Sequence, residues 1–597
     1  MKTGIISLVL LCLPVSCWAA DSLWTAYFEA ENFTSQTGDS KASSEHFPYI
    51  GTGYLEMGSQ NATATWNNIT VPTAGKYTLI FKYANNTEED LACDLKVNGA
   101  AIRNIPFGPF LQNWENIRSE LATGYNKESY GWSKYWNTRV IVDFKAGANT
   151  IELTTTSTEG GPHIDNIAVS AAISEPPAPI INVKDHGAVG DGSTDNSEAI
   201  AKAIAACPAG GSVVFDEGVY MTGSITLKGN MTLWISENAV VRNFAGNDKI
   251  KNYPEGSFQG GYITRYFMFG NQVDNLTITG GGTIDLNTTE RLPGRSSTRR
   301  PSTLGFVNSE NVTVTNIDMI HNDFWAFVPQ RSDSIIIDGL NIFNVNKDGI
   351  ATIDCHDITI TNCVISAGDD AMVPKSYDAS KGIDNMVAKN ITVNHTRWKG
   401  FKYGGSTKGN FTNSSFEDFA IVHSHAAIAL YAMSGIDVTN IKFNRFKMNW
   451  VYTPFFIVRD AAASTETPGM QNIHLSNMEV RNVYGSQGSS IQGNKVNGTV
   501  YPIKDIYFTN VDVQFKGGVN QVPSTPSEFP TGKYPETTVF GTFPAYGYFI
   551  RHAENVVFTN VTHSVSPTDA REAIFMEDVT GFENKGQAAS QPVKAKP

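Results

Sequence analysis

The chain has 597 residues, of which 41% are hydrophobic, a length and composition that allow more than one globular domain. Its formal net charge of −13 lacks the basic excess that nucleic-acid partners require, so we expect no nucleic acid among its partners. The six cysteines show no spacing typical of a zinc site.

The N-terminus has the features of a secretory signal peptide. Lys2 gives a positive start, an apolar run follows from Ile5 to Leu13, and small residues flank Trp18. The run is too short to cross a bilayer, and we expect no membrane span elsewhere. We therefore predict a signal peptide over 1–20 and a secreted protein, extracellular or periplasmic. Lipidation of Cys17 is the alternative.

A proline-rich stretch divides the rest of the chain. Residues 174–180 contain three prolines, which favour a stiff, extended linker. We expect one domain over 21–173, a second over 181–584, and a disordered polar tail over 585–597.

The first domain alternates apolar and polar residues between turn signals. Ala62–Trp66, Tyr77–Phe81 and Thr138–Val142 are examples. Because alternation places one set of side chains on each face of a strand, this pattern predicts an antiparallel β-sandwich.

Aromatic residues concentrate in one loop of this domain, from Trp114 to Trp136. Flat aromatic faces can stack on the apolar faces of sugar rings, although core packing uses the same residues. We take Trp132 and Trp136 as candidate sugar-binding residues.

The two ends of this domain resemble carbohydrate-binding modules of families 6 and 35. It opens with Phe28–Glu31 and closes with His163–Ile167. The resemblance implies a structural calcium ion held by Glu29, Glu31 and Asp165, whose hard oxygen atoms suit that ion. The alternative is that these are ordinary exposed charges.

The second domain repeats a short phrase: asparagine or aspartate, alternating β-branched residues, then asparagine. Asn311–Asn316 and Asp357–Asn362 are two copies, and Val312, Ile335 and Ile358 follow one another at intervals of 23 residues. A fixed interval of this size predicts a solenoid, and short strands without intervening helices predict a parallel β-helix. We expect the terminal asparagines to stack at its corners.

A solenoid needs a covered end. Residues 196–207 have helical periodicity behind a plausible N-cap, and we expect this helix to cover the first coil.

Three aspartates interrupt the repeat. Asp348 and Asp369 are 21 residues apart, close to one solenoid period, and Asp370 is adjacent. The spacing predicts that all three lie together on neighbouring coils, where mutual repulsion should raise at least one carboxyl pKa. Such a set suits glycoside hydrolysis, which needs a protonated acid and carboxylates that activate water. Calcium binding is the alternative.

The second domain resembles the polygalacturonases of glycoside hydrolase family 28 over nearly its whole length. The matching stretches are Val183–Asn196, Gly282–Asp285, Arg300–Pro301, Trp325–Pro329, Asn346–Gly349 and Gly368–Ser376.

The resemblance implies a right-handed β-helix that cleaves α-linked polysaccharide with inversion and without a catalytic cofactor. Asp369 would be the general acid, while Asp348 and Asp370 would hold and activate water. Inversion generally requires carboxyl groups about 6.5–9.5 Å apart. We expect the enzyme to be a monomer.

Two family motifs are missing. Lys399–Gly405 lacks the histidine of Gly-His-Gly, and Ala427–Tyr431 lacks the arginine and lysine that grip a substrate carboxylate. The substrate is therefore either pectic, such as galacturonan or rhamnogalacturonan, or a neutral or modified glycan.

Four residues are candidates for contacting the substrate in place of these motifs. Lys402, His423 and His425 lie in the same part of the repeat. Lys375 matches the family motif, with pairing to an aspartate as the alternative.

Two other functions fit parts of the pattern. A β-helix polysaccharide lyase would use the aspartates as a calcium site, and a non-catalytic glycan-binding β-helix would use the solenoid surface alone. Unsaturated products would identify the lyase, and binding without turnover would identify the second.

Overall fold

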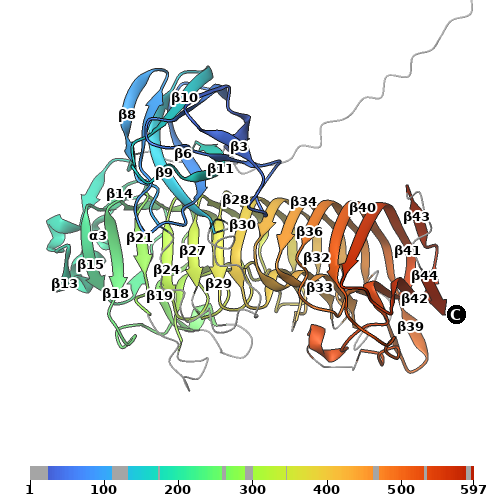
Figure 1. The fold of residues 1–597 in the computed structure, drawn as a ribbon. Coiled ribbons are helices and arrows are strands. Elements are labelled where there is room, and N and C mark those ends of the chain that lie inside the picture. Colours follow the sequence, from blue (N-terminus) through green and yellow to red (C-terminus); the bar gives the residue numbers. More distant parts are fainter. Residues whose placement is uncertain are drawn as a thin grey trace, which may run out of the picture.

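The computed structural model describes residues 25–109, 132, 134–171, 175–257, 264–288, 300–344, 346–405, 407–433, 435–460, 469–529, 534, 536–586 and 593–596. The predicted signal peptide and most of the aromatic loop lie outside these residues. The described chain forms a β-sandwich beside a long β-helix (Figure 1). The predicted all-β fold class is confirmed.

The sandwich consists of two antiparallel sheets. One contains β1 (Thr25–Glu29), β3 (Lys41–Ser43), β4 (Tyr54–Glu56), β6 (Gly75–Ala84), β9 (Trp136–Phe144) and β11 (His163–Ser170). The other contains β2 (Ser35–Thr37), β5 (Thr63–Val71), β7 (Cys93–Val97), β8 (Ala100–Ile105) and β10 (Gly147–Thr155). Alternate residues of β5, β6 and β10, such as Trp66, Phe81 and Leu153, form a buried core between the sheets.

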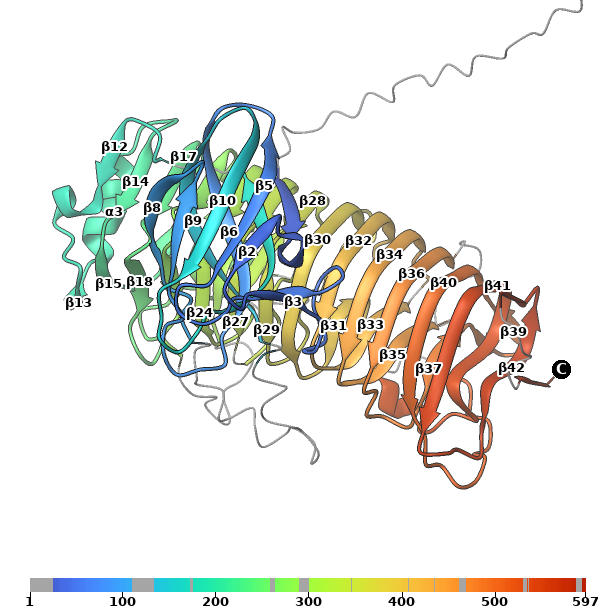
Figure 2. The ribbon, with the colours of Figure 1, turned by 45° about the horizontal axis from the view of Figure 1, so that its top comes forward.

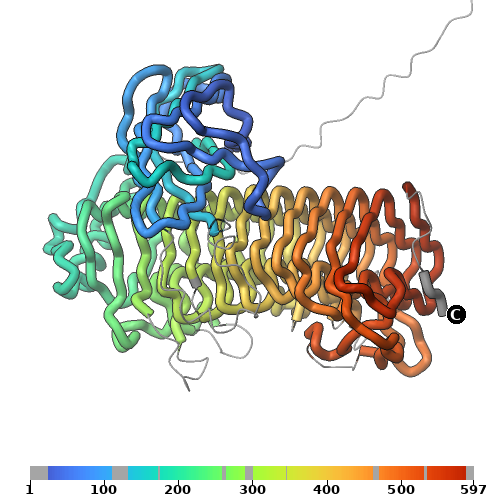
Figure 3. The backbone as a smooth tube through the Cα atoms, viewed as in Figure 1, coloured from blue at the N-terminus to red at the C-terminus, as the bar shows by residue number. Residues whose placement is uncertain are grey.

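The β-helix stacks three strands per coil, and we name its faces by their order along each coil (Figure 3). The first face begins with β12 (Ile180–Asn182), β14 (Ser212–Phe215), β17 (Met231–Ile235), β20 (Leu276–Thr279), β23 (Glu310–Thr315), β26 (Asp333–Asp338) and β28 (His356–Thr361). The second begins with β13 (Asp191–Asp195), β15 (Gly218–Thr222), β18 (Ala239–Asn243), β21 (Thr283–Asp285), β24 (Asp318–Asn322), β27 (Asn341–Asn344) and β29 (Val364–Ala367).

Later strands bend around the corner and supply both of these faces. They are β30 (Ile383–Thr396), β32 (Phe411–Ile421), β34 (Val438–Asn449), β36 (Met470–Arg481) and β40 (Ile503–Lys516). The third face contains β16 (Ile225–Thr226), β19 (Tyr266–Asn271), β22 (Ser302–Val307), β25 (Phe327–Gln330), β31 (Lys399–Tyr403), β33 (Ser424–Ala432), β35 (Val451–Arg459), β37 (Ser489–Gln492), β42 (Glu572–Thr580) and β44 (Val593–Lys596). The strand β41 (Ala545–Ser566) joins the third face to the first, where β43 (Glu583–Lys585) pairs with it. A hairpin of β38 (Asn494–Val496) and β39 (Thr499–Tyr501) projects from the last coils.

The predicted repeat sets the register of the coils. Val312 pairs with Ile335, and Ile335 pairs with Ile358, so residues 23 apart stack directly. Asn311 and Asn316 adopt left-handed backbone angles at the corners (φ 58° and 53°), a conformation that asparagine tolerates well. The predicted asparagine stacking is also present, since Asn275 donates to Asn230 at 2.9 Å.

The predicted helix covers the first coil as α3 (Ser197–Ala206), which buries Ile200, Ala203 and Ile204 against it. At the other end, β44 pairs with β42, so the prediction of a disordered tail is wrong for residues 593–596. Backbone pairing with the last coil orders these residues despite their polar composition. Among the described helices, none is long and apolar enough to cross a membrane.

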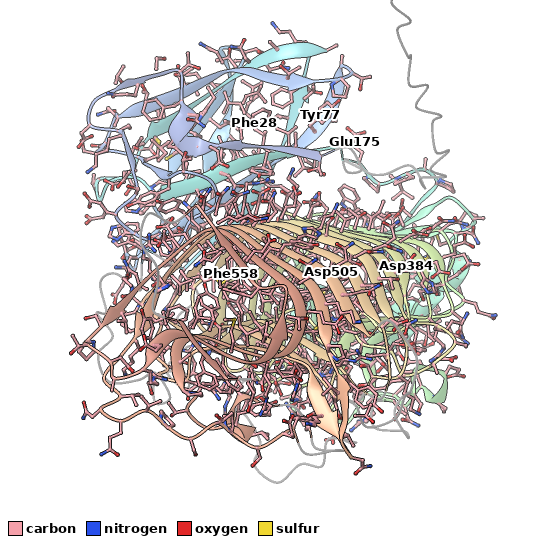
Figure 4. The ribbon with its side chains drawn as sticks, turned by 90° about the vertical axis from the view of Figure 1, so that its right-hand side faces the viewer. Phe28, Tyr77, Glu175, Asp384, Asp505 and Phe558 are labelled. Carbon is pink, nitrogen blue, oxygen red and sulfur yellow. The ribbon has the colours of Figure 1, made fainter. Side chains whose placement is uncertain are left out.

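The sandwich docks on the corner between the first and second faces (Figures 2 and 4). Lys82 Nζ donates to Asn390 Oδ1 at 2.7 Å, Ser170 Oγ donates to Asp338 Oδ2 at 2.6 Å, and the Tyr135 amide donates to Asn394 Oδ1 at 2.8 Å. The corner side chains of the solenoid therefore also bind the sandwich.

Candidate active site

The three aspartates lie at the corner between the second and third faces of two neighbouring coils. Asp348 precedes the position where Ile350 bridges to Met372, and Asp369 and Asp370 precede Met372 itself. One carboxylate oxygen from each aspartate lies within 4.8 Å of the others. The spacing of one coil therefore brings them together as predicted.

Each aspartate has a lysine partner. Lys375 Nζ lies 3.1 Å from Asp348 Oδ2, and Lys402 Nζ lies 2.7 Å from Asp370 Oδ2. Lys347 Nζ forms an ion pair with Asp369 Oδ2. The first two pairs are buried.

The pair of Lys347 and Asp369 is more open than the other two. Its side chains are 33% and 20% exposed, whereas those of Lys402 and Asp370 are 5% and 3% exposed. This is the pair that an incoming ligand would meet first.

At Asp370 the neighbouring lysines have the opposite effect on the carboxyl pKa to the rise that the sequence predicted. Burial opposes its ionisation, but the ammonium groups of Lys402 and Lys399 outweigh burial and lower the Asp370 carboxyl pKa. The repulsion predicted from three adjacent carboxylates does not raise this pKa, because the paired lysines neutralise the cluster. For Lys347, burial and the cations of Lys375 and Lys402 lower the ammonium pKa.

A distant segment completes the wall of the site. The Lys399 amide donates to Asp370 Oδ1 at 3.1 Å, and its side chain pairs with Glu536. Tyr534 accepts a hydrogen bond from Lys402. Tyr534 and Glu536 come from the connection between β40 and β41, which folds back over the coils that carry the aspartates.

The spacing of the oxygens suits a bound water molecule. A water that donates two hydrogen bonds of about 2.8 Å holds its acceptors about 4.5 Å apart. Asp348 and Asp370 each offer carboxylate oxygens at this corner, and each is paired with a buried lysine. A cation would also fit three oxygens at this distance, but the three lysine ammonium groups already occupy the carboxylates.

Comparison with known proteins places this site in a family. The sequence model of Glycosyl hydrolases family 28 matches residues 218–529, just over half of the chain, and includes all three aspartates. The chain belongs to glycosyl hydrolase family 28.

Individual relatives agree with this membership. A probable polygalacturonase of Vitis vinifera is 24% identical over 376 residues, covering 57% of this chain and 75% of its own. The family 28 exopolygalacturonase of Yersinia enterocolitica is 15% identical in sequence, covers 91% of this chain and 100% of its own, and has a TM-score of 0.50. This second likeness shows the shared fold.

The N-terminal segment has its own relative among solved structures. A family 35 carbohydrate-binding module (CBM35) from Paenibacillus barcinonensis is 30% identical, covering 25% of this chain and 99% of its own, with a TM-score of 0.19.

The missing family 28 motifs are also absent from the three-dimensional site. Ala427–Tyr431 lies within β33 with its side chains fully buried, so this stretch offers no cation. At the position of the missing histidine, Lys399 and Lys402 instead face Asp370 and Glu536. Lys402 is a candidate from the sequence, but Lys399 and Lys347 are not, because periodicity alone does not distinguish them from surface lysines.

The candidate substrate-binding residues have different surroundings. Lys375 pairs with Asp348 and lies 4.1 Å from the Trp325 ring centroid, and Lys402 is occupied by Asp370 and Tyr534. Both lysines are buried, and each binds one of the three aspartates.

The two candidate histidines belong to stacks of aromatic rings. His423 stacks between His395 and Tyr484, and His425 stacks on Tyr452 at 4.4 Å. Burial lowers the pKa of each histidine to about 4, so both are neutral at pH 7. His425 contacts the segment that covers the aspartates, since its Nδ1 lies 3.2 Å from Thr537 Oγ1.

The two sandwich candidates pack against other aromatic rings. Trp132 stacks on His163 at 3.7 Å, and Trp136 packs against Phe343 at 4.3 Å where the two domains meet. Glu29 and Asp165 interact closely enough for their charges to oppose ionisation.

Proposed function

We propose that this family 28 protein is a secreted enzyme that hydrolyses α-glycosidic bonds of a polysaccharide with inversion. The observation that carries the proposal is the aspartate cluster, in which each carboxylate pairs with a lysine and Asp369 is the most exposed of the three. Asp369, the open one, is the general acid that protonates the leaving oxygen. Asp348 and Asp370, each paired with a buried lysine, bind the attacking water and accept its proton.

These separate roles, one aspartate as acid and two that bind water, predict inversion of configuration. The water sits between Asp348 and Asp370, on the side of the sugar opposite the leaving oxygen that Asp369 protonates. The shortest oxygen separations within the cluster, up to 4.8 Å, fall below the usual distance between carboxyl groups of inverting enzymes. We therefore assign the water to the space between Asp348 and Asp370. Proton NMR of the first product anomer tests the assignment, and retention of configuration would reject it.

Two classes of substrate are candidates, and they differ in whether the sugar unit at the cleaved bond carries a carboxylate. Lys375, Lys399 and Lys402 are committed to enzyme carboxylates and are almost fully buried. Lys347 is the cluster lysine that is one-third exposed, so a uronate would meet it beside Asp369. We propose a pectic polysaccharide as the first candidate and a neutral or modified glycan as the second. Matched rates on galacturonan and carboxyl-reduced galacturonan separate the two.

A polysaccharide panel with sizing of the products tests the activity itself. Hydrolysis releases reducing ends without the ultraviolet absorbance of an unsaturated uronate. Absorbance at that band would identify a lyase, and a protein that binds glycans but never releases reducing ends would be the non-catalytic alternative.

We further propose that the sandwich binds glycan and holds a calcium ion. Glu29, Glu31 and Asp165 supply the oxygen atoms, and one buried oxygen of each glutamate has no hydrogen-bond partner within the described residues. Burial and neighbouring carboxylates raise the Glu29 pKa to about 9, while burial raises the Asp165 pKa to about 7 despite Lys82. A divalent cation would relieve this desolvation.

Secretion rests on the leader at residues 1–20, which we propose is removed during export. N-terminal sequencing of protein recovered from the culture medium or periplasm tests this, and an intact Met1 in that material would contradict it.

A further inference from the structure

A half-open cavity of about 270 Å³ separates the sandwich from the first coils of the β-helix. The sandwich lies over β24 and β27 in this region (Figure 2). The sandwich contributes the edge strand β9, from Trp136 to Ile141, and the β-helix contributes corner residues of three coils, including Trp234 and Asn316. No residue of the aspartate cluster appears among the described lining residues, so this cavity is separate from the candidate active site.

Two tryptophans form apolar walls of the cavity. Trp136 is partly exposed and rests on Phe343, while Trp234 is 7% exposed. Because they come from different domains, a ligand between them would contact both. Paired aromatic walls suit a flat ligand with an apolar face.

Two side-chain amide oxygens of the residues that line the cavity receive no hydrogen bond from the described residues. Asn137 and Asn316 are 1% and 5% exposed, and the Oδ1 atom of each has no hydrogen-bond partner within the described residues. Their amide groups are engaged elsewhere, since Asn137 Nδ2 donates to the Asn362 carbonyl at 2.8 Å. A buried acceptor without a donor is costly, so the fitting ligand brings hydroxyl or amide hydrogens.

The charges around the cavity cancel in pairs. Arg139 lies 2.8 Å from Asp318, and Glu237 lies 2.7 Å from Arg103. A phosphate or carboxylate ligand would need a cation with no such partner, and the described lining offers none. Hydroxyl donors, an apolar face and no net charge are the properties of a neutral sugar.

We propose that this cavity is a second carbohydrate site, which holds one or two neutral sugar units of a glycan across the two domains. Its volume is below the range of about 300–1,000 Å³ that accommodates drug-sized ligands, which limits the occupant to a short segment. The site is distinct from any calcium-dependent site of the sandwich and from the catalytic cluster, and it does not depend on which polysaccharide is cleaved.

Calorimetry on the full chain tests the proposal. The Asp369→Asn background prevents turnover, and the probes are the neutral tetrasaccharides of β-1,4-galactan, α-1,5-arabinan, xylan and cellulose. We expect at least one to bind, and we expect Trp136→Ala and Asn316→Ala each to weaken that binding at least tenfold. Ile102→Ala is the control, because Ile102 is an exposed apolar residue of β8 in the same domain and is not among the residues that line the cavity. This variant should change the affinity less than twofold.

Asn316→Gly, measured beside Asn316→Ala, protects the test against a folding artefact, because Asn316 has a left-handed backbone (φ 53°) that glycine adopts without strain and alanine does not. Asn316 Nδ2 makes a long contact of 3.5 Å with Thr78, so Asn316→Gly should leave the melting temperature nearly unchanged and should weaken binding as Asn316→Ala does. Failure of all four tetrasaccharides to bind, or full affinity in both Trp136→Ala and Asn316→Ala, would overturn the proposal. Neither result bears on hydrolysis at the aspartates, which is measured separately as reducing ends in the unmodified protein.

Discussion

Replacing Lys402 by methionine should damage both stability and the pH profile of the enzyme. Lys402 Nζ lies 2.7 Å from Asp370 Oδ2, with side chains 5% and 3% exposed. Removing one partner of a buried pair costs about 3–5 kcal/mol, because it leaves the other charge uncompensated. Asp370 keeps the Lys399 amide at 3.1 Å and the Lys399 cation nearby, so we expect the lower end, about 3 kcal/mol.

The sign of the pH effect follows from Asp370. Its lowered pKa gives a contribution to stability that is present above the unfolded pKa of about 3.9 and is lost as the pH falls through the folded pKa. Without Lys402, burial dominates and raises that pKa. The acid limb of the kcat/KM profile should therefore move upward by at least about one unit, equivalent to about 1.4 kcal/mol.

Urea unfolding and pH-dependent initial rates measure the two effects. The double variant Lys402→Met/Asp370→Asn removes the stranded charge, so it should regain most of the lost stability while remaining inactive. Lys408→Met, at an exposed lysine close in sequence, is the control and should behave as the unmodified protein. An acid limb that stays in place in Lys402→Met, or a double variant no more stable than the single, would refute the reasoning.

Three further outcomes are expected. Asp369→Asn should lower kcat at least about 100-fold while oligosaccharide affinity, measured by calorimetry, stays within threefold; substantial turnover would remove Asp369 from the acid role. Lys347→Met should raise KM on galacturonan but not on carboxyl-reduced galacturonan, with Lys347→Arg partly restoring it, and equal effects on both substrates would contradict a carboxylate contact. Chelator-treated protein should lose about 4 kcal/mol of stability as the pH rises from about 5 to 8, because the folded pKa of Glu29 is raised to about 9 and each pH unit below it is equivalent to about 1.4 kcal/mol. Added calcium should remove this dependence, and identical melting curves with chelator and with calcium would argue against the site.

Most of the fold could be predicted from sequence because successive coils of the solenoid repeat the same sequence pattern. The phrase around Val312 recurs at Ile335 and Ile358, and the three residues stack as expected. The same periodicity brought Asp348 and Asp369 together. Local pattern and global structure coincide wherever each coil contacts only its neighbours.

The wall of the site could not be predicted in this way. Tyr534 and Glu536 reach Lys402 and Lys399 across more than 130 residues, from a connection that carries no repeat signal. The pairing of Lys347 with Asp369 depends on side-chain direction at a corner, which periodicity does not specify. The expected rise in a carboxyl pKa assumed bare aspartates, and it fails at Asp370 because the compensating lysines come from other coils.

The docked sandwich changes how the solenoid should come apart. Its contacts run from Glu237 through Gly339 and Asn390 to Asn449, and so bridge coils that otherwise touch only their immediate neighbours. Within that span, a coil cannot unfold without also breaking its contacts with the β-sandwich. The coils carrying the aspartates lie inside it, whereas the hydrogen bonds named here end at Asn449. Amide exchange should therefore show the C-terminal coils opening first, with the catalytic corner protected as one cooperative block together with the sandwich.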